Sequence, residues 1–176
     1  MKVAAITTSD IANGPGIRCT IWVSGCNHKC PGCHNSELQD YNFGKHTLLS
    51  DEVYEKVSKE LNKPYISGIT LSGGDPLDQP FENLNNLLDF TKVISNQFTN
   101  KTIWIYSGGI YEDLIKYDVI KDILLNCDVL VDGLFDINKR DITLPFRGSS
   151  NQRIIDLKQT FEKNKVIEIN DDEFKQ

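Results

Sequence analysis

The sequence predicts an α/β fold with a mostly parallel sheet in a single domain over residues 1–176. Short apolar runs rich in β-branched residues alternate along the chain with stretches whose apolar residues follow a helical period. Such alternation is typical of parallel strands joined by right-handed helical crossovers. The chain contains too few of these units for a complete eight-stranded barrel. A partial (β/α) barrel and an open doubly wound sheet both fit this pattern.

Six apolar runs have the residue types that favour a strand. They cover 17–23, 67–71, 102–106, 128–131, 153–155 and 165–169. The first four end in a cysteine-rich loop, Gly73-Gly74-Asp75, Ser107-Gly108-Gly109 and Asp132-Gly133, respectively. In both candidate folds, ligands bind at the carboxyl ends of the parallel strands. We therefore expect one functional site that brings these four strand ends together.

Four segments are predicted to be helices from their apolar periodicity. They cover 51–61, 81–97, 111–126 (as one helix or two pieces) and 156–163. Ser50 is the expected N-cap of the first helix, since its side-chain oxygen can accept a hydrogen bond from a free backbone N–H. We expect the polar tail after about residue 170 to be frayed.

The composition limits the classes of function. The formal net charge of −6 argues against nucleic-acid binding, which needs clustered Lys and Arg. The sequence contains no run of about 18 apolar residues, the length needed to span a membrane, and Asp10 interrupts the apolar run near the N-terminus. We therefore expect a cytoplasmic protein without membrane contact. Of the five cysteines, three lie within eight residues, which indicates metal binding rather than disulfides.

These three cysteines form the pattern Cys26-x-x-x-Cys30-x-x-Cys33 directly after a predicted strand. Three thiolates on one short loop can converge on one 4Fe-4S cluster, and they leave the fourth iron without a protein ligand. An open iron can bind a substrate directly, as the open position of a catalytic zinc does. Gly25 and Gly32 give the loop the backbone freedom to wrap around a cluster.

A zinc site made of the three cysteines plus His28 or His34 is the alternative. Structural zinc motifs usually combine two short ligand pairs that are far apart in sequence, and this chain has one group of ligands. The spacing therefore favours the cluster and leaves zinc open. Cys19 and Cys127 lie on or beside predicted strands, so we expect them to be buried as small hydrophobic residues.

The cysteine spacing resembles that of the radical S-adenosylmethionine (SAM) superfamily, and the flanking residues resemble its glycyl-radical activating enzymes. The segments that carry this second resemblance are 13–18 (NGPGIR), 33–35 (CHN), 72–77 (SGGDPL) and 104–108 (WIYSG). Two more segments, 128–135 (DVLVDGLF) and 147–155 (RGSSNQRII), resemble the members that activate anaerobic ribonucleoside-triphosphate reductase. The resemblance extends from about residue 13 to about residue 169.

The resemblance implies a partial barrel of radical SAM type, with a 4Fe-4S cluster on Cys26, Cys30 and Cys33. It implies that SAM binds the open iron and is cleaved to methionine and a 5′-deoxyadenosyl radical, which takes a hydrogen atom from a glycine of the partner. The implied partners are the large catalytic subunit of anaerobic ribonucleoside-triphosphate reductase and an electron donor such as flavodoxin. The alternatives are an activator of pyruvate formate-lyase type, a small radical SAM enzyme for a free metabolite, and a non-catalytic zinc or iron–sulfur binding module.

Six positions are assigned to SAM on the basis of the resemblance: Asn35, Gly73, Gly74, Asp75, Ser107 and Asp132. The two glycines would let the backbone approach the methionyl group, and the aspartate after them would bind its ammonium. The residues at the two later strand ends would hold the carboxylate or the ribose. The asparagine and both aspartates are alternatively explained as turn residues.

Four further residues are candidates for recognising a carboxylate or the glycine loop of the partner: Arg18, Arg147, Asn151 and Arg153. They could equally form a solvated surface. Gly32 stands where many radical SAM proteins have an aromatic residue near the adenine. The residue that packs against the adenine is therefore not assigned.

Overall fold

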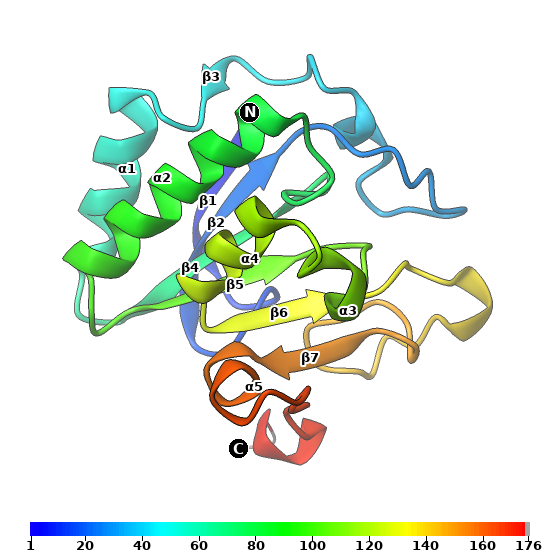
Figure 1. The fold of residues 1–176 in the computed structure, drawn as a ribbon. Coiled ribbons are helices and arrows are strands. Elements are labelled where there is room, and N and C mark those ends of the chain that lie inside the picture. The colour runs from blue at the N-terminus through cyan, green and yellow to red at the C-terminus, as the bar shows by residue number, and fades with distance from the viewer. Residues whose placement is uncertain (175–176) are drawn as a thin grey trace.

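Seven strands form one mixed sheet in the computed structural model, which describes residues 1–174 (Figure 1). In spatial order they are β3 (His46–Thr47), β1 (Lys2–Asp10), β2 (Ile17–Val23), β4 (Ile66–Gly73), β5 (Thr102–Tyr106), β6 (Val129–Asp132) and β7 (Arg153–Asp156). β2, β4, β5 and β6 are parallel to their neighbours in this group. β1, β3 and β7 pair antiparallel. The predicted α/β fold with a parallel core is confirmed.

Five of the six predicted strands are present, with ends shifted by at most two residues. The prediction of a strand over 165–169 is wrong. Two backbone hydrogen bonds join this segment to β7, and only Glu168 forms a bridge, with Ile155. β1 and β3 were not predicted. β1 alternates exposed residues such as Thr7 and Ser9 with partly buried ones, so it lacks the continuous apolar run of a central strand.

The helices are α1 (Asp51–Leu61), α2 (Phe81–Gln97), α3 (Tyr111–Leu114), α4 (Asp118–Leu125) and α5 (Leu157–Lys163). All four predicted helices are confirmed, and the third is divided into α3 and α4. The hydroxyl of Ser50 accepts a hydrogen bond from the backbone N–H of Val53, so it caps α1 as expected. Short 3-10 helices are η1 (Ser36–Gln39), η2 (Ile137–Lys139) and η3 (Asp171–Phe174).

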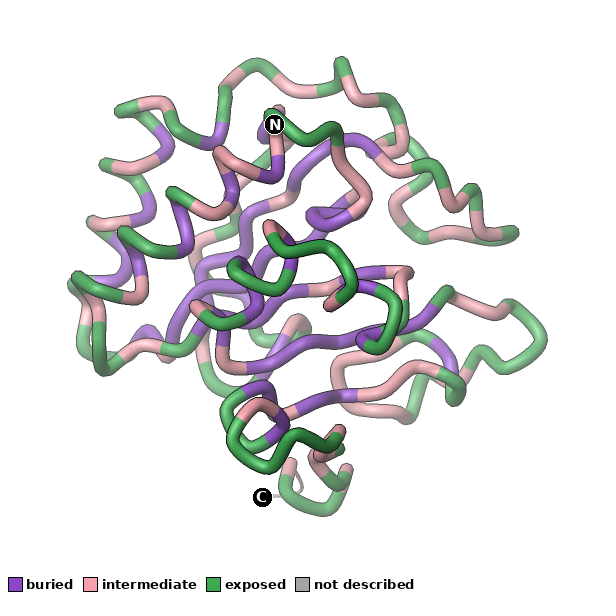
Figure 2. The backbone as a smooth tube through the Cα atoms, in the orientation of Figure 1, coloured by how far each residue is buried: buried purple, intermediate pink, exposed green. Residues whose placement is uncertain are grey.

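All five α-helices contribute side chains to one core on a single face of the sheet. Among the described residues, the buried members of the smaller cluster on the other face come from strands: Trp104, Val129, Val131 and Ile154. A doubly wound sheet has helices on both faces. The one-sided arrangement therefore excludes that alternative. Figure 2 shows the buried strands in purple behind helices whose outer sides are green.

The chain after residue 170, expected to be frayed, forms η3 and packs against the sheet. The Phe174 ring contacts Phe146 and Trp104, with ring centroids 5.0 Å and 6.0 Å apart. Aromatic burial thus holds a segment whose other residues are polar. Residues 175–176 lie outside the described part of the chain. None of the helices within residues 1–174 has the combination of length and apolar character that a membrane span requires.

Candidate functional site

The cysteine loop begins at the carboxyl end of β2 and is held at both ends by backbone hydrogen bonds. The N–H groups of Gly25 and Cys26 donate to the carbonyls of Leu38 and Gln39, at 2.8 Å and 3.1 Å. The N–H of Cys33 donates to the carbonyl of Cys30 at 3.1 Å. The three cysteines of the loop are free thiols of intermediate exposure. The loop therefore presents its sulfurs at the edge of the sheet where the sequence predicted a site.

Gly73 and Gly74 bring the end of β4 against the cysteine loop. The N–H of Gly74 donates to the carbonyl of Val23, and the N–H of Asp75 donates to that of Gly25, at 2.8 Å and 2.9 Å. A Cβ atom on Gly74 would lie 2.5 Å from the Gly25 oxygen, and one on Gly73 would lie 2.3 Å from the Val23 oxygen. Both glycines thus have a packing role in the structure, and their contact with SAM stays a prediction.

Gln79 is a third connection between β4 and the loop, and it was not predicted. Its Nε2 atom lies 3.1 Å from the carbonyl oxygen of Ser24, 2.9 Å from that of Gly25 and 2.9 Å from that of Asp75. An amide with two hydrogens is therefore shared among three acceptors. The sequence carried no signal for this role, because a glutamine before a helix has no special pattern.

Asp75 connects three strand ends through its carboxylate. It is 2% exposed, and its Oδ2 lies 2.9 Å from His28 Nε2, 2.9 Å from the hydroxyl of Ser107 and 2.8 Å from the N–H of Gly108. Its Oδ1 accepts a hydrogen bond from the N–H of Leu77 at 2.8 Å. This contact is the one expected of a turn residue, the alternative role that the sequence allowed for Asp75. The hydrogen bond to Asp75 raises the pKa of His28, although desolvation opposes this shift.

Asn35 and Ser107 belong to the same group of contacts. The side-chain amide of Asn35 donates to the carbonyl of Gly73 at 3.1 Å. The hydroxyl of Ser107 donates to Asp75 and accepts from the N–H of Gly109 at 3.0 Å. The structure thus brings together five of the six residues assigned to SAM, including both glycines, next to the cysteine loop.

Asp132, the sixth residue, is paired with a residue that we assigned to the partner. It is fully buried at the end of β6, where its Oδ1 accepts from Arg153 Nε at 2.9 Å and its Oδ2 from the N–H of Tyr111 at 2.7 Å. Arg153 also contacts Glu112 at 2.8 Å. Hydrogen bonds to Asp132 and Glu112 raise the pKa of Arg153, and the hydrogen bond from Arg153 lowers the pKa of Glu112. The structure therefore shows a structural ion pair at this strand end.

Arg18 lies away from the strand ends that form the site. Its guanidinium is fully buried near the start of β5, donates to the Thr70 hydroxyl at 2.8 Å and to the Thr102 carbonyl at 3.0 Å, and stacks over Trp104. Burial lowers its pKa to about 10. The guanidinium donates to buried backbone and hydroxyl oxygens, and its role toward a carboxylate or the partner stays a prediction.

The other two candidates for partner recognition lie in the loop between β6 and β7. Arg147 forms an ion pair with Asp171 at 2.6 Å. Asn151 is exposed, and its side-chain amide donates to the carbonyl of Leu134 at 2.8 Å. This loop and the cysteine loop project on the same side of the sheet (Figure 1). The role of Arg147 and Asn151 toward a partner stays a prediction.

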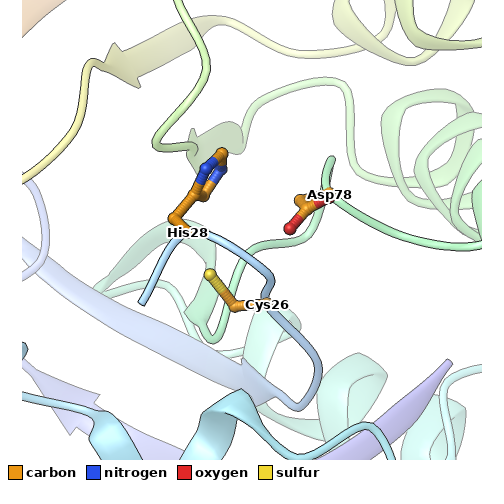
Figure 3. A group of neighbouring side chains, drawn as sticks. All are labelled: Cys26, His28 and Asp78. Atoms are coloured by element: carbon orange, nitrogen blue, oxygen red, sulfur yellow. The ribbon is translucent and has the colours of Figure 1, made fainter. Parts of the chain in front are cut away.

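The donor set fits a cluster held by three thiolates. Two ligands of one zinc ion lie about 3.8 Å apart in a tetrahedral site with Zn–S of about 2.3 Å. Among residues 1–174, the group whose ligand atoms all lie within 4.8 Å of one another is Cys26, His28 and Asp78 (Figure 3). The three cysteines do not form such a group, so at least two of their sulfurs lie more than 4.8 Å apart. Wider spacing suits thiolates that bind different irons. Desolvation raises the pKa of Cys26 to about 11, so metal binding there releases a proton.

The two other cysteines cannot supply a fourth ligand. Cys19 and Cys127 are 0% and 3% exposed and belong to the core, as predicted. Burial raises the pKa of both thiols, which is the behaviour of inert core cysteines. The chain thus provides three accessible thiols at one place.

The fold and the cysteine loop define a protein with one iron–sulfur cluster, and residues 12–155 match the family described as a 4Fe-4S single cluster domain. The chain is also similar to anaerobic ribonucleoside-triphosphate reductase-activating proteins of several organisms. It is 36% identical to that of Enterobacteria phage T4, over 88% of this chain and 93% of the relative. It is 40% identical to that of Pasteurella multocida (83% and 91% covered) and to that of Escherichia coli K12 (81% and 90% covered). The chain therefore belongs to the family of anaerobic ribonucleoside-triphosphate reductase-activating proteins.

Proposed function

We propose that this chain is the radical SAM enzyme that installs a glycyl radical on the large catalytic subunit of an anaerobic ribonucleoside-triphosphate reductase. The observation that carries the proposal is the loop with Cys26, Cys30 and Cys33, three accessible thiols with no fourth cysteine near them. Such a loop leaves one iron of a 4Fe-4S cluster open. The names of the relatives supply the target.

The three cysteines would each bind one iron, and the open iron would bind the amino and carboxylate groups of SAM. The cluster and SAM, when bound, would supply reductive cleavage of the SAM carbon–sulfur bond to methionine and a 5′-deoxyadenosyl radical. This radical would take a hydrogen atom from the target glycine. The chain positions the loop and shields the site. An electron donor such as flavodoxin would provide the electron.

We assign Asp75 mainly to positioning. Five donors surround its two oxygens: His28, Ser107, Gly108, Leu77 and Asp78. A carboxylate offers about four lone-pair sites, so its capacity is already used. To bind the SAM ammonium, Asp75 would have to release one of these donors. The methionyl group would then depend more on backbone groups near Gly73 and Gly74.

We further propose that the sheet is a partial barrel whose open side is covered by the reductase. The helices lie on one face, as on the outside of a barrel, while Ala5, Thr7 and Ser9 of β1 are exposed. A reactive radical must be kept from water. A large partner that presents its glycine over this open side would both close the site and deliver the substrate.

The test is anaerobic reconstitution with iron and sulfide, followed by dithionite, SAM and an assay of 5′-deoxyadenosine. Cys26→Ala, Cys30→Ala and Cys33→Ala should each abolish the product, and the core variant Cys127→Ala should retain it. A reductase subunit added to the reaction should show a glycyl radical by electron paramagnetic resonance. Radical formation on an added pyruvate formate-lyase instead would favour the alternative target, and product from all three cysteine variants would exclude radical SAM chemistry at this loop.

A further inference from the structure

We infer that the cluster-free chain has a site for a single divalent transition-metal ion at Cys26, His28 and Asp78, and that this ion and the 4Fe-4S cluster exclude each other. The inference rests on the proposed function in one respect, the assignment of Cys26 to the cluster. The zinc site that the sequence left open consists of all three cysteines plus His28 or His34. The structure instead gathers one cysteine with a carboxylate from another segment.

The three side chains meet across two segments of the chain (Figure 3). Cys26 and His28 come from the cysteine loop, and Asp78 comes from the turn between β4 and α2. Their ligand atoms all lie within 4.8 Å of one another, and each residue is of intermediate exposure. Ligands of one tetrahedral ion lie about 3–4 Å apart, so closure requires shifts of roughly 1 Å. A thiolate, an imidazole and a carboxylate are the ligands that Zn²⁺ takes in proteins, and water would fill the fourth position.

A buried carboxylate supports the histidine of this site. His28 Nε2 lies 2.9 Å from Asp75 Oδ2, and Asp75 is 2% exposed. A histidine that binds a metal almost always donates its other ring N–H to such a group, which sets the tautomer and strengthens the ligand. In the tautomer whose Nε2–H donates to Asp75, Nδ1 is the ring nitrogen that would bind the ion. Ser107 and Gly108 hold the same Asp75 oxygen, so the support is rigid.

Asp78 is also held in place. The backbone N–H of Asn27 donates to its Oδ2 at 2.5 Å, and the hydroxyl of Tyr41 donates to its backbone carbonyl at 2.9 Å. Asn27 lies between the two loop ligands in sequence, so the contact ties the carboxylate to them. The carboxylates of Asp75 and Asp78 add negative charge at the place where a cation would bind.

The ion and the cluster compete because both need the thiolate of Cys26. A given site of nitrogen, oxygen and sulfur ligands generally has a lower affinity for Fe²⁺ than for Co²⁺ or Zn²⁺. A chain that meets Zn²⁺ before iron would therefore have one cluster ligand blocked. The site would act as a metal-dependent check on cluster assembly.

The first experiment is a titration of Co²⁺ into the anaerobic cluster-free chain, followed by its thiolate-to-cobalt charge-transfer absorbance. We expect one Co²⁺ per chain. Cys26→Ala should remove the absorbance. Asp78→Asn should weaken Co²⁺ binding by at least about tenfold, because mutation of a residue that only hydrogen-bonds to a metal ligand already lowers the affinity by that much. Cys33→Ala and the matched surface control Asp89→Asn should bind as the wild type does. Equal loss in Cys33→Ala and Cys26→Ala, or unchanged binding in Asp78→Asn, would overturn the inference.

The second experiment loads the chain with Zn²⁺ before iron and sulfide are added, and it measures iron per chain over time. Zinc should slow iron uptake in the wild type and in Asp89→Asn, and much less in Asp78→Asn. Equal slowing in both aspartate variants would contradict the shared site. These readouts need no SAM and no reductase, so their failure would leave the proposed function untouched, and a failed deoxyadenosine assay would leave the ion site untouched.

Discussion

The side-chain amide of Gln79 lies 2.9 Å from the carbonyl oxygen of Gly25, the residue before the first cysteine of the loop. The same nitrogen lies within hydrogen-bonding distance of the carbonyls of Ser24 and Asp75. One amide therefore joins the end of β2, the start of the cysteine loop and the end of β4. We infer that Gln79 is a positioning residue for the cluster, which acts through these backbone carbonyls.

Gln79→Glu tests this role with little change in shape. The carboxylate cannot donate and would face three carbonyl oxygens, so the free energy of unfolding of the cluster-free chain should fall by about 1–3 kcal/mol. Iron bound per chain after reconstitution should fall in parallel. Gln97→Glu, at the exposed far end of α2, is the matched control and should change neither quantity. Normal iron content in Gln79→Glu would show that the amide does not position the loop.

Gly74→Ala tests the contact between β4 and the loop. The new Cβ would lie 2.5 Å and 2.7 Å from the backbone oxygens of Gly25 and Leu38, which cannot move without displacing the loop. We expect a loss of stability of about 1–3 kcal/mol, the usual cost of overpacking, and a lower iron content. In Gly109→Ala the nearest atoms belong to the flexible end of the Leu114 side chain, so its iron content should stay normal. Equal iron loss in both variants would argue against the contact.

Asp132→Ala separates a structural role from a role in SAM binding. The substitution would remove the buried partner of Arg153. Arg153 is one quarter exposed and would still pair with Glu112. We expect a loss of roughly 3 kcal/mol in the free energy of unfolding, measured by urea denaturation. A double-mutant cycle with Arg153→Ala should show strong coupling. Normal stability together with weaker SAM binding would instead support the assignment made from the resemblance.

The pair of Arg153 with Glu112 predicts a dependence of stability on pH. The hydrogen bond from Arg153 lowers the pKa of Glu112 in the folded chain. The contribution of the Glu112 carboxylate to the free energy of unfolding is therefore complete above its unfolded pKa of about 4.3. It is lost as the pH falls through the lower pKa of the folded chain. Glu112 is half exposed, so Glu112→Gln should cost less than about 1 kcal/mol at pH 7.

The comparison of stability at neutral and acidic pH checks this sign. The difference between wild type and Glu112→Gln should disappear in acid, once Glu112 is protonated in both states. Glu55→Gln, at an exposed position on α1, serves as a second carboxylate control. A difference that grows as the pH falls would contradict the predicted direction.

The sequence by itself determined the parallel core, the helices, the cysteine loop and the family. These features depend on short spacings: apolar periods within one element, and three thiols within eight residues of one loop. It also indicated that Gly73-Gly74-Asp75 and Ser107 lie near that loop, because the carboxyl ends of neighbouring parallel strands meet at one edge.

Only the tertiary structure decided which polar groups are free and which are already paired. Arg18 and Asp132 are buried with partners, and Asp78 and Gln79 reach the loop although nothing in their local pattern marks them. The contacts that they make with Thr70, Arg153, Asn27, Ser24 and Gly25 span 21 to 55 residues of the sequence. Contacts over such distances follow from how the strands and helices pack, and the free energy of a polar group depends on that burial and on its partners.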